Sequence, residues 1–255
     1  MSSNKANPDR RARAEQMRKE RERAAKRRRN GITVGIVVIV VVLIAVAGFG
    51  IYQATSNDAG SGGAPEGVTS KGGIVYDQEA ATGSSSGDSK PVEVVAYEDF
   101  YCPACRAFEE ASGDYLQSAV EDGTISVEYR PIAILDRMSP DQYSTRSASA
   151  SACVMDSAGP EAFYEFHNLL YENQPPEGSP GPDATQLTTF AGEAGADGVS
   201  SCIEDDAYEG WVTEQTDAFG EDGYGETPTV LVDGERVPTP SPANLEKAIQ
   251  AASAE

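Results

Sequence analysis

The chain of 255 residues is long enough for one or two domains, and its 41 acidic and 20 basic side chains give a formal net charge of −21. Residues 1–30 contain 12 basic and 4 acidic side chains, which leaves 8 basic and 37 acidic side chains in the rest of the chain. Because nucleic-acid affinity depends on basic side chains that neutralise phosphates, we expect no nucleic-acid partner for residues 53–255. The 39% of hydrophobic residues can supply a core, which argues against a wholly disordered chain.

An uncharged apolar segment follows the basic tail. Residues 32–52 contain no charged side chain, and a helix of this length, at about 1.5 Å per residue, spans the roughly 30 Å of a hydrocarbon core. We predict a transmembrane signal anchor at 31–52, and the basic cluster at 26–29 predicts that the tail, 1–30, is cytoplasmic and the rest extracytoplasmic. The Ala-Val-Ala sequence at 45–47 leaves a cleavable signal peptide as the alternative, which would export the same residues.

A change in composition near residue 91 separates a linker from a folded domain. Gly, Ser, Ala, Thr and Asp dominate residues 53–90, which predicts a flexible linker. The only apolar cluster of this linker, 74–76, is a candidate for docking on the folded domain. The domain itself is predicted to span 91–255.

The folded domain begins with a predicted βαβ unit. A β-rich run at 91–97 leads into residues of helical composition from Cys102 onward, and 125–130 alternates apolar and polar side chains until Pro131 ends the pattern. Such a unit is expected to be right-handed and to contain parallel strands.

Helical and strand patterns alternate in the rest of the domain. Between about 139 and 219 we predict a helical insert with helices at 144–156, 160–173, 183–195 and 199–219. Strand composition returns on either side of an Asp-Gly turn, at 229–232 and 235–237, and a last helix at 242–252 begins with Ser241 as its N-cap. The order of elements indicates an α/β fold.

All four cysteines follow the apolar segment, in a compartment where disulfides persist. Three connectivities are open to four cysteines. Cys102 and Cys105 pair by spacing, whereas Cys153 and Cys202 lie 49 residues apart on separate predicted helices. If these helices pack together, we expect Cys153–Cys202 to be a structural disulfide that contributes about 2–4 kcal/mol.

Cys102 stands where a predicted strand gives way to a helix. We therefore expect Cys102 at the N-cap and Pro103 at the first helical position. The free N–H groups at this helix end stabilise a thiolate and lower the pKa of Cys102, while Cys105 is expected to be more buried and less acidic. This asymmetry predicts disulfide exchange: a substrate thiolate attacks Cys102 and expels Cys105, and a second substrate thiolate then expels Cys102.

The same cysteine spacing has other interpretations. A zinc site needs four ligands, but the chain has one His and no second close pair of cysteines, so we expect no metal and no cofactor. A purely structural disulfide, or a redox-inactive helix that serves as a docking module, remains an alternative.

Three segments resemble the DsbA-like thiol–disulfide oxidoreductases of the thioredoxin superfamily. They are YEDFYCPAC at 97–105, FHNLLYENQ at 166–174 and GETPTVLVDG at 225–234. The resemblance covers most of 91–252 and is closest to the membrane-tethered actinobacterial type, which has a second disulfide in its helical insert. It implies a thioredoxin fold with an inserted helical domain, here preceded by one transmembrane helix.

The resemblance also implies a function and a substrate surface. Thr227–Pro228 is implied to be a cis-proline loop beside the cysteines, where an unfolded substrate pairs as an added strand, with Pro103 and Ala104 completing the surface. The implied activity is the donation of disulfides to the thiols of unfolded exported proteins. The implied re-oxidant is a quinone-linked membrane protein of the DsbB or VKOR type. We expect a monomer.

Two residues depart from the family pattern. Ala96 occupies the position of the buried Asp of thioredoxin, which argues against a thioredoxin-like reductase. Ala104 replaces the His of the best-known family member, which predicts a less acidic Cys102 and a weaker oxidant. A reductase or isomerase of exported disulfides, or a non-catalytic binding module, therefore remains an alternative function.

Other polar and aromatic side chains near these motifs have two interpretations each. Glu98 and Asp99 are candidates for proton relay or for simple solvation. Arg106 either pairs with the Cys102 thiolate or offsets local acidity. His167, on an apolar helix face, is expected to be a packed residue of the insert, and Tyr208 and Trp211 are expected to be core residues.

Overall fold

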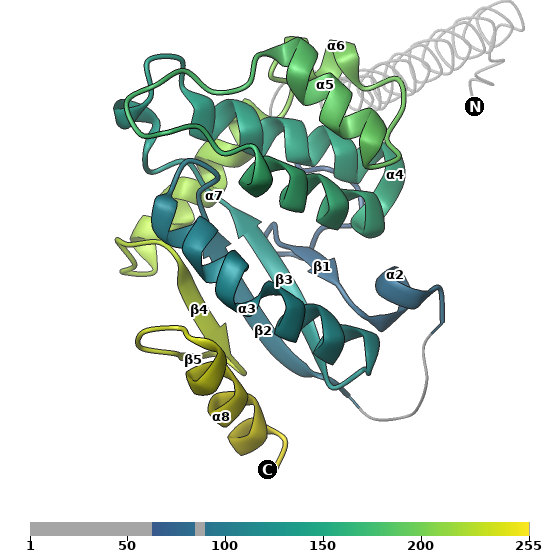
Figure 1. Cartoon of the computed structure of the whole chain (residues 1–255), viewed down its shortest axis with the longest axis vertical. Helices are drawn as coiled ribbons and strands as arrows, with labels where there is room; N and C mark the ends of the chain where they lie inside the picture. The colour runs from purple at the N-terminus through teal and green to yellow at the C-terminus, as the bar shows by residue number, and fades with distance from the viewer. Residues whose placement is uncertain (1–62, 85–89, 255) are drawn as a thin grey trace, which may run out of the picture. The chain divides into compact units, whose positions relative to one another are not determined.

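The computed structural model describes residues 63–84 and 90–254, which belong to the unit Asp58–Glu255 (Figure 1). The predicted transmembrane anchor, 31–52, and the basic tail lie outside the described residues. In the two described ranges, no helix combines the length and the apolar character needed to cross a bilayer.

A sheet of five strands in the order β1-β3-β2-β4-β5 organises the fold. The strands are β1 (Ile74–Tyr76), β2 (Val92–Glu98), β3 (Ile125–Pro131), β4 (Thr229–Val232) and β5 (Glu235–Arg236). β2 and β3 are parallel with Val92 opposite Ile125, whereas β4 is antiparallel to β2. The predicted βαβ unit and the mixed α/β fold are confirmed.

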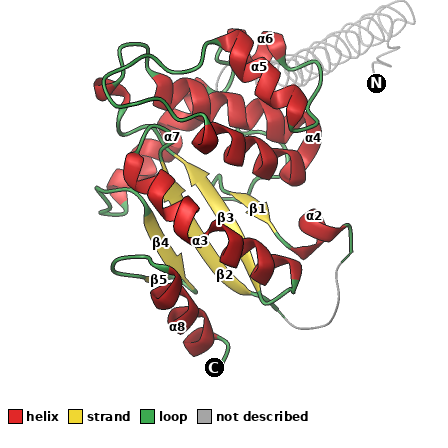
Figure 2. Cartoon of the chain, in the orientation of Figure 1, coloured by secondary structure: helices red, strands yellow, loops and turns green. Residues whose placement is uncertain are grey.

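Helices connect and cover these strands. They are α2 (Gln78–Thr82), α3 (Pro103–Glu121), α4 (Tyr143–Glu172), α5 (Ala184–Glu193), α6 (Ser200–Glu204), α7 (Glu209–Glu221) and α8 (Pro242–Ala252), with a 3-10 turn at Asp136–Met138. Figure 2 shows α3 and α8 in front of the sheet. α8 begins as predicted, because the Ser241 side chain accepts a hydrogen bond from the backbone N–H of Asn244.

Alternating side chains of the central strand bury the two faces of the sheet. Val94 and Ala96 join the main core, which receives Phe108, Leu116 and Val120 from one face of α3. Val95 and Tyr97 point to the opposite face and pack in a second cluster with Phe219 of α7. The sheet is therefore enclosed between helices, and the carboxyl end of β2 leads into a buried site.

The helical insert differs in detail from the prediction. The two helices predicted at 144–156 and 160–173 are confirmed: they are the two halves of α4, which meet at a kink where Gly159 has a non-helical φ of +83° that only glycine adopts without strain. The later part of the insert differs. The single helix predicted at 199–219 is wrong, because the chain turns between α6 and α7. Asp206 adopts a left-handed φ of +46° in this turn, a conformation that Asp tolerates better than most residues.

The segment predicted as a linker contributes to the folded domain. β1 pairs antiparallel with β3, with Ile74 opposite Tyr129, and the Ile74 side chain is fully buried. The Tyr76 ring stacks on Tyr164 of α4 with centroids 4.1 Å apart. The predicted docking of 74–76 on the folded domain is therefore confirmed, and the flexible linker predicted for 53–90 is wrong over residues 74–82, where β1 completes an edge of the sheet and α2 follows it.

A disulfide and buried aromatic side chains hold the insert together. Cys153 of α4 and Cys202 of α6 are bonded, with Cα atoms 6.0 Å apart. Trp211 of α7 is 1% exposed, and Tyr208 packs against the same core. These residues join helices that are distant in sequence.

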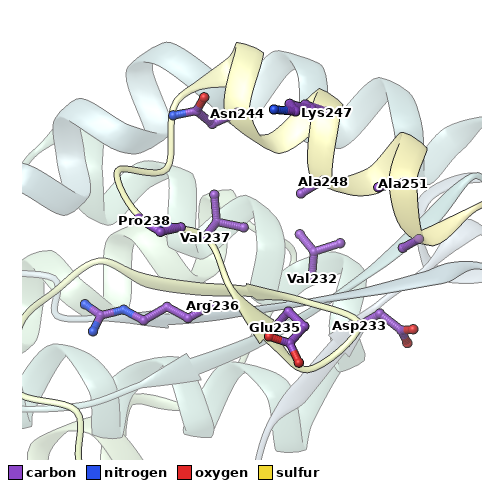
Figure 3. Close-up of a pocket in the computed structure, with 11 residues that line it drawn as sticks. Val232, Asp233, Glu235, Arg236, Val237, Pro238, Asn244, Lys247, Ala248 and Ala251 are labelled. Carbon is purple, nitrogen blue, oxygen red and sulfur yellow. The ribbon is translucent and has the colours of Figure 1, made fainter.

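A pocket of about 560 Å³ lies between the β4–β5 hairpin and α8 (Figure 3). Val232 and Val237 from the hairpin face Ala248 of α8 across it, and Arg236 and Lys247 lie at its walls. None of the predicted site residues lines this pocket, so the candidate active site is found elsewhere.

Candidate active site

The two closely spaced cysteines lie at the start of α3. Cys102 is the N-cap residue and Pro103 occupies the first turn, as the sequence predicts. Neither cysteine is in a disulfide. Cys102 is 7% exposed to solvent, while Cys105, one turn further along the helix, is fully buried. Pro103 and Ala104 are exposed beside them. An incoming thiol would therefore reach Cys102 before Cys105.

The loop before β4 faces the cysteines. The Thr227–Pro228 peptide bond is cis, and the Cys102 thiol donates a hydrogen bond to the carbonyl oxygen of Thr227, 3.5 Å away. The structure thus brings together Cys102, Cys105 and the loop Thr227–Pro228, which are more than a hundred residues apart in sequence. A backbone edge beside a reactive sulfur can hold an extended chain.

The two thiols have opposite electrostatic environments. A hydrogen bond from the Cys105 thiol, with further hydrogen bonds from Thr227 and from the backbone of Cys105 and Ala104, outweighs burial and lowers the pKa of Cys102 to about 6. Burial, the Cys102 sulfur and the Glu98 carboxyl raise the pKa of Cys105 well above that of a free thiol. Cys102 is therefore the more acidic thiol of the pair, and Cys105 is the thiol that retains its proton.

Alkylation of the reduced protein by iodoacetamide should reveal this difference. We expect the rate at Cys102 to reach half its maximum near pH 6, whereas Cys105 stays unreactive up to at least pH 9. The thiolate also stabilises the reduced fold: because its pKa is lowered on folding, this contribution is complete above pH 9 and is lost as the pH falls through 6. Mass spectrometry of peptides after timed alkylation measures the rates at Cys102 and Cys105. A Cys102 midpoint near pH 9 would contradict the expected lowering of its pKa.

Two acidic side chains at the end of β2 are buried rather than solvated. Asp99 accepts hydrogen bonds from the backbone N–H groups of Tyr101 and Leu135 and from the Ser144 hydroxyl. Burial raises the pKa of Asp99 to about 6, although these hydrogen bonds oppose the shift. Asp99 therefore fixes the loop that carries Cys102, and simple solvation is wrong for Asp99.

Glu98 lies in a different buried cluster. Its Oε2 atom is 2.8 Å from His167 Nε2, and the ligand atoms of Glu98, Glu109 and His167 all lie within 4.8 Å of one another. Aromatic rings surround the imidazole, including Tyr129 at a centroid distance of 4.6 Å and Tyr171 at 5.0 Å. His167 is thus a packed residue of α4, as predicted. Its contact with Glu98 links the insert to the strand that precedes the cysteines.

Two further residues at the site, Tyr101 and Gln174, have contacts that the sequence does not predict. The Gln174 side chain donates hydrogen bonds to the carbonyl oxygens of Phe100 and Cys102 at 2.9 and 3.0 Å. The Tyr101 hydroxyl donates to the carbonyl oxygen of Ser179 at 2.9 Å. These bonds join the loop after α4 to the turn before α3, so the insert braces the cysteine-bearing turn. Both residues lie in the segments 97–105 and 166–174 that resemble the DsbA-like family, but the pattern of these segments does not indicate the hydrogen bonds.

Arg106 lies on the exposed side of the same helix. Its Nε atom donates to Glu110 Oε1 at 2.8 Å, an i to i+4 ion pair on the surface. This pair favours the interpretation that Arg106 offsets local acidity. An exposed pair of this kind contributes little to stability.

Comparison with known proteins agrees with this geometry. The sequence model of a family described as thioredoxin matches residues 79–251. The reduced disulfide bond oxidoreductase DsbG of Mycobacterium tuberculosis is 33% identical, with a TM-score of 0.62 over 72% of this chain and 88% of that chain. Oxidised DsbA of the same organism is 31% identical, with a TM-score of 0.61 over 72% of this chain and 93% of that chain.

A curated protein also shares part of the sequence. The serine/threonine-protein kinase PknE of Mycobacterium tuberculosis is 30% identical over 133 residues, which are 50% of this chain and only 23% of the kinase. The match therefore concerns a segment of PknE shorter than a quarter of its length.

Proposed function

Since the chain belongs to the DsbA-like thiol–disulfide oxidoreductases of the thioredoxin family, we propose that it donates disulfides to exported proteins through Cys102 and Cys105. The observation that carries this proposal is the contrast between the two thiols. Cys102 is 7% exposed and has a lowered pKa, whereas Cys105 is fully buried and has a raised pKa. A stabilised thiolate favours the reduced form of the protein, and hence oxidation of its substrate.

The proposed cycle starts from the Cys102–Cys105 disulfide. A substrate thiolate attacks the Cys102 sulfur, forms a mixed disulfide and expels Cys105 as a thiolate that takes up a proton. A second substrate thiolate then attacks the substrate sulfur, and Cys102 leaves as a stable thiolate. The substrate gains a disulfide and the protein retains two electrons. The edge at Thr227–Pro228 is proposed to hold the substrate, with Pro103 and Ala104 beside it.

The setting of this chemistry is part of the proposal. We propose a cytoplasmic tail at 1–30, a single membrane helix at 31–52 and a catalytic domain on the outer side, where disulfides persist. Re-oxidation is assigned to a quinone-linked membrane protein of the DsbB or VKOR type. Attachment to the same membrane raises the effective concentration of the two partners.

The reduction potential of the Cys102–Cys105 pair tests the direction of electron transfer. The full-length protein in detergent is equilibrated with glutathione buffers, and its thiols are counted by alkylation and mass spectrometry. We expect a value closer to the roughly −120 mV of strong oxidants than to the roughly −270 mV of thioredoxin. A value near that of thioredoxin would favour the reductase, and the absence of exchange would favour a binding module.

A further inference from the structure

Another pocket, of about 420 Å³, opens between α3 and the second half of α4. Its volume lies in the range of sites that bind small molecules. α3 contributes Arg106, Glu109 and Asp114 to its walls, and α4 contributes Tyr171 and Glu172. The proposed disulfide exchange makes no use of this pocket.

Acidic side chains dominate the charge of the pocket. Its basic residue, Arg106, is paired with Glu110 through an Nε to Oε1 contact of 2.8 Å. The remaining carboxyls are those of Glu109, Asp114 and Glu172, and none of them has an ion pair within the described ranges, 63–84 and 90–254. The pocket therefore has an excess of negative charge, which repels anions and attracts cations.

Two polar groups of the pocket are buried without a partner. The Tyr171 side chain is 4% exposed, and its hydroxyl has no hydrogen-bond partner in the part of the chain that the structure describes. In the same part of the chain, Glu109 Oε1 is shielded from solvent and has no partner either. Because buried polar groups of folded proteins are nearly always hydrogen-bonded, these two groups indicate a ligand that brings N–H donors.

Gly113 keeps the approach to Glu109 open. It lies inside α3, where glycine is about 0.5–1 kcal/mol less favourable than alanine, and it lines the pocket. A Cβ atom at this position would lie 3.2 Å from Glu109 Oε2, which is closer than ordinary van der Waals contact. The helix thus has a residue of low helix propensity at the point where a side chain would narrow the pocket.

The positions of the carboxyls distinguish an organic cation from a metal ion. A metal ion needs ligand atoms that converge on one point, and among the described residues such atoms belong to Glu98, Glu109 and His167. Asp114 is about 7.5 Å from Glu109 along the helix axis, and Glu172 lies on the other helix. Carboxyls that are spread around a cavity fit a ligand whose positive charges lie on separate atoms.

Aromatic side chains complete the pocket. Tyr164 and Tyr171 line it from α4, together with the side-chain amide of Asn168. The face of an aromatic ring attracts an ammonium group and also packs against methylene groups. The amide and phenol oxygens can accept hydrogen bonds from N–H groups. Carboxyls, rings and polar oxygens together favour an aliphatic amine over an inorganic ion.

We propose that the pocket between α3 and α4 binds an aliphatic polyamine, a chain of methylene groups that carries two or more ammonium groups. One ammonium group would lie at Glu109 and the Tyr171 hydroxyl, and another at the outer carboxyls of Asp114 and Glu172. The methylene chain would pack against Tyr164. The inference does not depend on the proposed function, because binding requires neither thiol of the active site.

Titration calorimetry of the full-length protein in detergent, with spermidine as the probe and at physiological ionic strength, tests the assignment. We expect saturable binding of one spermidine per protein. Asp114→Asn and Glu172→Gln should each weaken binding about tenfold, as expected for the loss of one charge-assisted hydrogen bond. Both residues are exposed, so the variants should fold.

The matched control for these variants is Glu165→Gln. Glu165 is an exposed residue in the same half of α4, but it does not line the pocket. Its replacement changes the net charge of the protein by the same amount as Glu172→Gln does. Glu165→Gln should therefore bind spermidine like the wild type. An equal loss of affinity in all three variants would overturn the inference, because it would indicate general attraction to an acidic surface.

A further variant closes the pocket without changing its charge. Gly113→Leu replaces a poor helix former by a good one and places a side chain against Glu109. We expect this variant to retain the circular dichroism of the wild type and to lose spermidine binding. Gly192→Leu is its control, because a Cβ atom at this position of α5 meets nothing within 4 Å. It should bind spermidine normally, and normal binding by a folded Gly113→Leu would overturn the inference.

Other probes identify the kind of cation. Butylamine should bind much more weakly than spermidine, and equal affinity would overturn the polyamine assignment in favour of a single ammonium group, such as a lysine side chain. Calcium ions that displace spermidine and lose affinity in Asp114→Asn would overturn it in favour of a metal site. Absence of saturable spermidine binding to the wild type would overturn it outright. The proposed function is unaffected by any of these results, because the reduction potential tests it separately.

Discussion

Replacement of Cys102 by Ser is expected to reduce dithiol oxidation to the level of the uncatalysed reaction. The Cys102 sulfur is attacked while it is part of the active-site disulfide and later leaves as a thiolate, and a hydroxyl, which forms no disulfide, can do neither. Cys105→Ser should behave differently, because Cys102 still forms a mixed disulfide but the buried second thiol needed to restore the active-site disulfide is missing. The two variants thus separate the roles that the structure gives to the two sulfurs.

The measurement uses oxidised protein, a fluorescent dithiol peptide and non-reducing gels. Cys105→Ser, incubated with glutathione disulfide, should accumulate a mixed disulfide, and Cys102→Ser should accumulate none. The matched control is the double variant Cys153→Ser/Cys202→Ser, which retains the active-site pair and should oxidise the peptide at temperatures where it is folded. If Cys102→Ser retained activity, the domain would act as a binding module.

Removal of the Cys153–Cys202 disulfide is expected to cost about 2–5 kcal/mol of the free energy of unfolding. The bond joins residues 49 positions apart and connects α4 to α6. Its loss therefore acts mainly by increasing the conformational entropy of the unfolded chain. For a domain of this size, the melting temperature should fall by about 2–4 °C for each kcal/mol.

Urea unfolding of Cys153→Ala/Cys202→Ala against the wild type measures this loss. Dithiothreitol should destabilise the wild type substantially, whereas the double variant should show only the change that comes from reducing Cys102 and Cys105. Equal stability of variant and wild type would mean that the bond does not constrain the unfolded chain.

Local signals in the sequence determine much of the domain. The change to helical composition from Cys102 onward predicts α3, and Pro103 marks its first turn. Because N-caps and amphipathic faces depend on residues within a few positions of each other, the place of Cys102 is readable from the sequence alone.

Features that depend on distant contacts are not readable in this way. Ile74 and Tyr76 form only a short apolar cluster, and its role depends on the free edge of β3 and on the Tyr164 ring. The pairing of Glu98 with Glu109 likewise arises only when α3 folds back over β2, since neither residue has a local pattern that distinguishes it from a surface glutamate. The turn at Asp206 interrupts a run whose composition otherwise favours a helix.

The position of Trp211 has a practical consequence for spectroscopy. It is the only tryptophan of the chain, and it lies buried in α7, where the helices of the insert pack together. Intrinsic fluorescence excited at the indole band will therefore report the hydration of this layer of helices and not an average over the domain. Comparison of that emission with far-ultraviolet circular dichroism would show whether the insert and the sheet melt together or in sequence.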